Sequence, residues 1–126
     1  MLMSYAPPIV RLVLAALLMA CVPAVYAQSK DPIEVGTAAL DRNHFATAYR
    51  AWIGPARKGD AMAQNNVGYL YEHGLGLTQS YVEAMAWYRK AANKNLAQAQ
   101  YNIGTLYYYG YGVERNTREA VRWFRQ

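Results

Sequence analysis

The stretch GYLYEHGLGLTQS, residues 68–80, decides the fold, because its spacing of glycines returns thirty-six residues later in GTLYYYGYGVERN, residues 104–116. Extending the comparison aligns residues 61–90 with residues 97–126 without a gap, and thirteen of the thirty positions are identical. Self-similarity at a fixed period of this length is typical of proteins built from repeated structural units. The chain therefore contains an internal repeat of 36 residues.

Each repeat is predicted to be a helical hairpin. The apolar residues of its first helix, about Ala61 to His73, are spaced by three and four positions, so they share one face of a helix. The second helix begins after a turn and again has one apolar face. The apolar residues are Ala63, Val67, Leu70 and Tyr71 in the first helix, and Ala84, Trp87, Tyr88 and Ala91 in the second.

Local signals mark where these helices end and begin. Gly74 suits the left-handed backbone conformation that ends a helix, and Gly76 lets the chain turn again. The segments SYVE (80–83) and NTRE (116–119) each place a capping side chain three residues before a glutamate, so a capping box is expected in both copies.

The presence of a glycine inside the first helix of each copy is not explained by a turn. Gly68 and Gly104 each cost about 1 kcal/mol relative to alanine in a helix interior. We expect that the backbone of the partner helix passes close enough to exclude a methyl group, with Trp87 or Trp123 packing nearby.

Residues 28–60 are predicted to form a partial repeat that caps the array at its N-terminal side. Asp31 is placed to cap a short helix that has Pro32 at its first position and runs to about Leu40. A second helix follows, with a kink expected at Pro55 because proline clashes with the carbonyl group one turn earlier. The array then contains two and a half to three hairpins.

Residues 43–126 resemble the Sel-one-like repeat, a relative of the tetratricopeptide repeat. The resemblance rests on the repeated alanines, the Gly-x-x-Tyr-x-x-Gly-x-Gly run and the later Ala-x-x-Trp. It implies an all-α solenoid of stacked helix-turn-helix hairpins in a right-handed superhelix, with one repeat at 61–96 and another at 97–126 that is truncated in its C-terminal helix. It also implies an adaptor or scaffold that binds a protein or peptide.

Some exported relatives in that family carry a cysteine pair in each repeat and are linked to penicillin binding or hydrolysis, but these repeats lack cysteine. His44 and His73 lie far apart and are interpreted as solvated residues at helix ends. We therefore expect no enzyme, no catalytic residues, no cofactor and no metal site. The alternative function is a cell-wall or β-lactam-associated binding protein or hydrolase.

The candidate binding surface lies on the first helices, which are expected to line the concave face of such a stack. Residues that differ between the copies there can specify a partner, and exposed tyrosine offers much contact area at low entropic cost. By contrast, Tyr107 is interpreted as framework, and Tyr109 and Tyr111 as partly buried spacers. The candidate partner-binding residues form two stripes, Asn65, Tyr69 and Glu72, and Tyr101, Thr105 and Tyr108.

Residues 1–27 are predicted to be a cleaved export signal. One positive charge at Arg11 precedes an apolar run that is too short to span a bilayer, and small residues precede a cleavage site after Ala27. Acylation at Cys21 is the other interpretation. Both predict a periplasmic or extracellular protein, and a net charge of +5 with mixed signs argues against nucleic acid as a partner.

The C-terminal end departs from the repeat pattern. Asn95 stands where glycine normally ends the second helix, in a left-handed position that asparagine tolerates. The sequence stops at Gln126, before the counterpart of AANKN (91–95), with Trp123 and Phe124 close to the end. We expect either a truncated chain or self-association through this open repeat.

Overall fold

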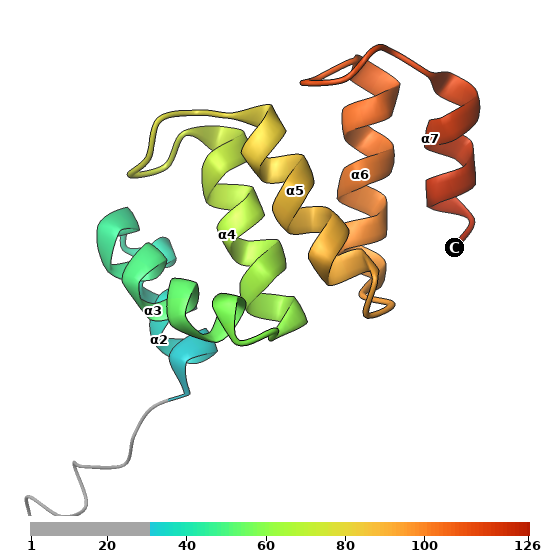
Figure 1. Cartoon of the computed structure of the whole chain (residues 1–126). Helices are drawn as coiled ribbons and strands as arrows, with labels where there is room; N and C mark the ends of the chain where they lie inside the picture. Colours follow the sequence, from blue (N-terminus) through green and yellow to red (C-terminus); the bar gives the residue numbers. More distant parts are fainter. Residues whose placement is uncertain (1–30) are drawn as a thin grey trace, which may run out of the picture. The chain divides into compact units, whose positions relative to one another are not determined.

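The computed structural model describes residues 31–126, and within them the chain forms six helices and no strand. The helices make three successive hairpins, and each helix packs most extensively against its neighbours in the sequence (Figure 1). The all-α solenoid of hairpins is confirmed. The expected export signal and the alternative acylation site at Cys21 lie outside the described residues. The helices are α2 (Pro32–Asp41), α3 (Phe45–Arg57), α4 (Ala61–His73), α5 (Tyr81–Ala92), α6 (Ala97–Tyr109) and α7 (Thr117–Phe124).

The helix ends follow the sequence signals. The side chain of Asp31 accepts a hydrogen bond from the backbone of α2, and Ser80 and Asn116 do the same three residues into α5 and α7. Gly74 and Gly110 end α4 and α6 in the left-handed conformation, with φ of 62° and 74°. The predicted glycine turns and side-chain caps are therefore confirmed in both copies. The reciprocal half of each expected capping box is not formed, because the backbone N–H groups of Ser80 and Asn116 donate to the carbonyl oxygens of Tyr71 and Tyr107.

The second helices end in a related way. Asn95 has φ of 61°, as expected, and the position 36 residues earlier is Gly59, also with positive φ. Helix α3 continues through Pro55 and ends two residues later, so Pro55 occupies its last turn. The expected kink at Pro55 stays a prediction.

The core consists of small residues at helix contacts and larger ones between them. Ala48, Ala84 and Ala120 recur at the repeat period and are fully buried, which lets neighbouring helices approach closely. The spaces between helices are filled by larger apolar side chains. Among these, Trp52, Val67, Leu70, Tyr88, Ile103 and Leu106 are all fully or almost fully buried.

The helix-interior glycines make room for an aromatic ring. A Cβ atom on Gly68 would lie 2.7 Å from the ring of Tyr88, and one on Gly104 would lie 2.5 Å from the ring of Phe124. The expectation that Trp87 or Trp123 packs there is wrong, because the ring comes from the next residue of the partner helix. Backbone is also near at Gly68, where Ala84 O would lie 3.3 Å from the added carbon.

The same aromatic position recurs in all three hairpins. Trp52, Tyr88 and Phe124 are separated by 36 residues, and Trp52 packs over Gly36 of α2 in the first hairpin. Trp52 also donates from Nε1 to the carbonyl oxygen of Ile33 at 3.3 Å. In each hairpin, one aromatic ring of the second helix thus packs against one glycine of the first helix.

Candidate functional site

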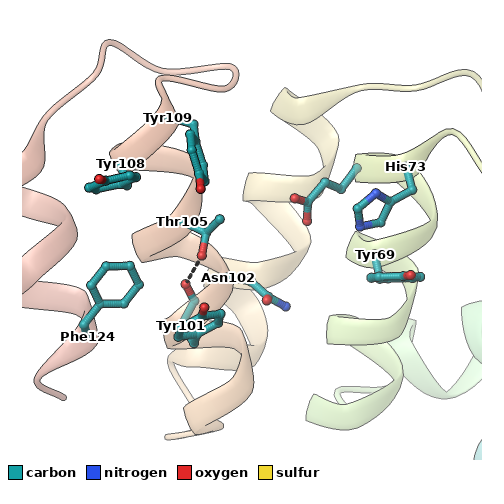
Figure 2. Close-up of a pocket in the computed structure, with 9 residues that line it drawn as sticks. Tyr69, His73, Tyr101, Asn102, Thr105, Tyr108, Tyr109 and Phe124 are labelled. Carbon is teal, nitrogen blue, oxygen red and sulfur yellow. Dashed lines mark hydrogen bonds between the residues drawn. The ribbon is translucent and has the colours of Figure 1, made fainter.

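A pocket of about 360 Å³ opens between α4 and α6, the first helices of the last two hairpins (Figure 2). We call it the α4–α6 pocket. Helix α4 contributes one wall, α6 the other, and α7 a single side chain. The lining residues are Tyr69, Glu72 and His73 from α4, Tyr101, Asn102, Thr105, Tyr108 and Tyr109 from α6, and Phe124 from α7.

The structure brings five of the six predicted binding residues together in this pocket, and Asn65 is the exception. Asn65 is only 1% exposed, and its side-chain oxygen accepts a hydrogen bond from Asn102 Nδ2 at 3.0 Å. The expectation that it faces a partner on the open surface is wrong, because the following repeat covers it.

The Asn102–Asn65 hydrogen bond joins α6 to α4, so it holds two successive repeats in register beside the pocket. Asn102 lines the pocket itself, although it is identical to Asn66 at the same place in the earlier copy and so did not stand out as a variable position. A polar bridge between the two walls is therefore part of the site.

Glu72 is oriented by a hydrogen bond from the hairpin core. The hydroxyl of Tyr88 donates to Glu72 Oε2 at 2.5 Å, and the ring of Tyr88 is fully buried. Burial, followed by the hydrogen bond to Glu72 and the carboxylate charge, raises the pKa of Tyr88. The phenol therefore stays protonated and remains a donor to Glu72.

Aromatic side chains form most of the exposed surface at the α6 side of the pocket. Tyr101 is 62% exposed and Phe124 43%, and their ring centroids are 5.3 Å apart. Tyr108 and Tyr109 meet edge to face with centroids 5.0 Å apart. These distances lie in the range of favourable aromatic pairs, so the rings support one another before any ligand arrives.

His73 faces Tyr69 at the α4 side, with ring centroids 4.3 Å apart. It is an exposed residue at a helix end, as expected, yet it also lines the pocket. Its spacing of four residues from Tyr69 was the signal that could have added it to the predicted stripe.

Tyr109 differs from its predicted role as a partly buried spacer because it lines the pocket, whereas Tyr111 lies outside it. Their exposures are 57% and 41%, because α6 ends at Tyr109 and the following turn leaves both rings at the surface. Tyr111 stacks on Tyr81 of α5 at a centroid distance of 4.8 Å, and Tyr109 stacks on Tyr111 at 5.4 Å. The exposed aromatic surface therefore extends beyond the pocket, over the start of α5.

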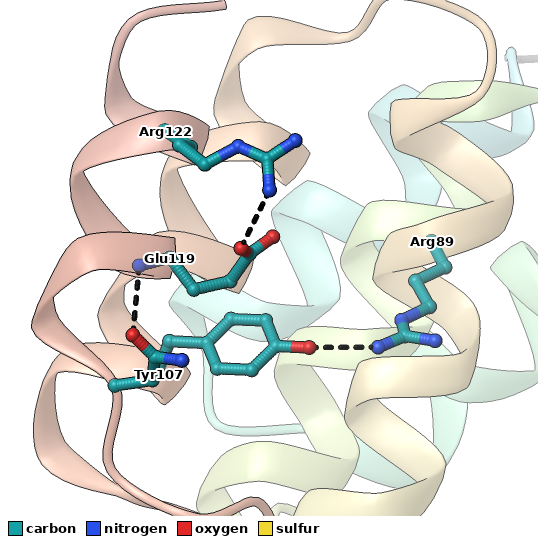
Figure 3. A network of polar contacts seen from close by, with 5 residues as sticks. Arg89, Tyr107, Glu119 and Arg122 are labelled. Atoms are coloured by element: carbon teal, nitrogen blue, oxygen red, sulfur yellow. Dashed lines mark hydrogen bonds and ion pairs between the residues drawn. The ribbon is translucent and has the colours of Figure 1, made fainter.

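Tyr107 belongs to the hairpin framework, as expected. Its ring packs against the core of the last two hairpins, and its hydroxyl accepts a hydrogen bond from Arg89 Nη2 at 3.0 Å (Figure 3). Figure 3 also shows the ion pair between Arg122 and Glu119 at 3.1 Å, which is the only one in residues 31–126. Glu72 therefore has no cationic partner in the described part of the chain.

In residues 31–126, no three His, Cys, Asp or Glu side chains come close enough together to hold a metal ion. None of the helices in this part of the chain is long and apolar enough to cross a membrane.

Two segments of the chain match a known protein family. The sequence pattern of the Sel1 repeat matches residues 61–96 and again residues 97–126. The chain belongs to the Sel1 repeat family. Sel1 repeat proteins generally serve as scaffolds for protein interactions and are typically not enzymes.

Solved structures of other Sel1 repeat proteins agree with this fold. A Sel1 repeat protein from Oxalobacter formigenes is 35% identical with a TM-score of 0.70, over 77% of this chain and 39% of that one. The protein c5321, described as a protective antigen of uropathogenic Escherichia coli strains, is 31% identical with a TM-score of 0.71. That match covers 81% of this chain and 22% of c5321, so the chain spans well under half of either relative. A comparison with curated proteins gave no match.

Proposed function

We propose that this Sel1 repeat protein is an exported, non-enzymatic scaffold that binds a protein or peptide segment in the α4–α6 pocket. One observation carries the proposal: exposed aromatic rings from two successive repeats surround a hollow of about 360 Å³. A volume near the lower end of the usual range for ligand pockets, ~300–1,000 Å³, suits a few side chains of a peptide.

The rigidity of the walls supports binding by this surface. Apart from Phe124, the lining side chains project from two helices that are joined by the Asn102–Asn65 hydrogen bond. Tyrosine has few rotatable bonds, so little entropy is lost when Tyr101 or Tyr108 is held against a partner. The site is therefore largely organised before binding.

Export is supported by the sequence of residues 1–27, with its single Arg11, its apolar run and the small residues before Gln28. The similarity to c5321, described as a protective antigen, is consistent with that location. Cell fractionation of the producing organism with an antibody against residues 31–126 tests this part of the proposal, and recovery only from the cytoplasm would contradict it.

A capture experiment tests the binding site. Envelope extract is passed over the immobilised protein, over a Tyr101→Ala/Tyr108→Ala variant and over a Val82→Ala control, each shown to be folded by circular dichroism. Val82 is a suitable control because it is an exposed apolar residue that does not line the pocket. We expect a protein that is retained by the wild type and the control but lost from the double variant. Equal retention by all three would contradict the proposal.

The absence of catalysis is tested separately. The protein is incubated with a chromogenic β-lactam and with purified peptidoglycan, and hydrolysis is followed over time. Turnover above that of a heat-denatured sample would contradict a purely binding role.

A further inference from the structure

The charge of the pocket wall differs from that of the chain. The whole sequence has 13 Lys and Arg against 8 Asp and Glu, yet no Lys or Arg lines the α4–α6 pocket. Glu72 is the only acidic lining residue, and the remaining ones are aromatic or uncharged polar side chains apart from His73. The pocket therefore selects against anionic groups and offers one carboxylate to a cation.

Glu72 is prepared for such a partner but has none within residues 31–126. One carboxylate oxygen accepts from Tyr88, and no Lys, Arg or His of the described residues pairs with the group. Because the Tyr88 hydroxyl is a neutral donor, it orients the carboxylate without cancelling its negative charge. A cationic group entering the pocket would supply the missing counter-charge.

The aromatic lining adds a second attraction for a cation. The faces of Tyr and Phe rings attract ammonium and guanidinium groups within about 6 Å of the ring centroid. The molecule already shows this for a lining residue, since the guanidinium carbon of Arg115 lies 5.9 Å from the ring centroid of Tyr108. That contact is at the outer limit of the range, and Arg115 itself does not line the pocket.

We infer that the α4–α6 pocket receives an arginine side chain of a bound peptide, with its guanidinium group paired to Glu72 and stacked on the exposed tyrosines. Arginine suits the site better than lysine because a planar guanidinium group can stack on an aromatic ring while it donates to a carboxylate. The inference rests on the proposed function and specifies the partner of the same site.

The experiment is a selection of random peptides displayed on phage against the full chain. Selected peptides are counter-screened on the Tyr101→Ala/Tyr108→Ala variant, on Glu72→Gln and on the control Glu114→Gln. Glu114 is exposed and outside the pocket, and Glu72→Gln keeps an oxygen that can accept from Tyr88. A synthetic peptide of the selected sequence is then compared with one in which citrulline, a neutral analogue, replaces arginine.

We expect selected peptides to share a fixed arginine and to lose binding on the double tyrosine variant. Citrulline, and Glu72→Gln, should each weaken binding about tenfold, as for the loss of one charge-assisted contact, while Glu114→Gln has no effect. The citrulline comparison leaves the protein unchanged, so it decides the matter even if Glu72→Gln destabilises the fold.

Two other outcomes overturn the inference in different ways. Peptides that need Tyr101 and Tyr108 but have no fixed arginine, or bind equally well with citrulline, would overturn the arginine pocket and leave the proposed function standing. If no selected peptide depends on the two tyrosines, both the arginine pocket and the proposed peptide-binding function are wrong.

Discussion

The two helices of each hairpin are held together by different contacts in the last two hairpins, although these hairpins are copies of one sequence pattern. In the earlier hairpin the hydroxyl of Tyr88 donates to Glu72. In the later one the same two positions are Phe124 and Tyr108, so the donor hydroxyl and the acceptor carboxylate are both absent. The ring of Tyr88 is fully buried, whereas that of Phe124 is nearly half exposed beside the pocket.

The difference shows that a buried polar pair behaves as one unit. At the buried position of Tyr88, a hydroxyl left without a partner would cost about 1–3 kcal/mol, so Tyr88 depends on Glu72, whereas the partly exposed ring of Phe124 needs no such partner. The residues at the equivalent positions of the later hairpin form pocket surface instead, because Tyr108 and Phe124 both line it. One hairpin therefore supplies the oriented charge and the other the aromatic wall.

The largest expected effect comes from the glycines under these two rings. Gly68→Ala should lower the free energy of unfolding by about 2 kcal/mol, because the added methyl group meets the fully buried ring of Tyr88. Gly104→Ala should be nearly neutral, since Phe124 is exposed enough to shift and alanine gains about 1 kcal/mol in a helix. Urea unfolding measures both, and equal losses would show that the two rings are held alike.

The second effect is a fall in the free energy of unfolding at alkaline pH. The pKa of Tyr88 in the folded state is raised above its ordinary value of 10.0. Tyr88 therefore contributes its full stabilisation to the fold below pH 10, and this stabilisation is lost as the pH rises toward the folded-state pKa. Over that window the free energy of unfolding should fall by about 1.4 kcal/mol per pH unit for this group. Thermal melts at increasing pH, with Tyr88→Phe as the control that removes this slope, check the prediction. An unchanged slope in the variant would contradict it.

The third effect is the coupling between Tyr88 and Glu72. Tyr88→Phe and Glu72→Ala should each cost about 1 kcal/mol of unfolding free energy, and the double variant about the same as either alone, because one hydrogen bond is lost in every case. A double-mutant cycle by urea unfolding measures the coupling. Additive losses would mean that the contact contributes nothing to stability.

The smallest effect is expected from giving the last hairpin the tyrosine of its neighbour. Phe124→Tyr should change the unfolding free energy by less than about 0.5 kcal/mol, because the ring is partly exposed and water can satisfy the new hydroxyl. The same urea experiment measures it. A loss of 2 kcal/mol or more would show that the Phe124 ring edge is sealed from solvent.

Sequence reasoning predicted the hairpins, their caps and their glycine turns because these depend on residues close together in the chain. It also predicted most of the pocket wall, since Tyr69 and Glu72, like Tyr101, Thr105 and Tyr108, are neighbours on a single helix. Both predictions, of the hairpins and of the pocket wall, were based on the 36-residue period of the sequence.

The errors lie where two helices meet. Asn65 has the spacing of an exposed stripe, but the next repeat covers it through Asn102, and spacing within one helix does not reveal that cover. Phe124 enters the pocket from α7, so no periodicity within α4 or α6 could have included it. The role of Tyr109 was misjudged because the direction of a side chain at a helix end depends on the turn that follows.

The two walls of the α4–α6 pocket belong to successive repeats, and this has a mechanical consequence. In a solenoid each repeat contacts mainly its neighbours, so bending the array changes the separation of equivalent helices. A ligand that contacts both α4 and α6 would oppose a change in the distance between these two helices. For the proposed ligand, binding and the curvature of the array would be coupled, so a force that straightens or bends the stack would change the affinity of the pocket.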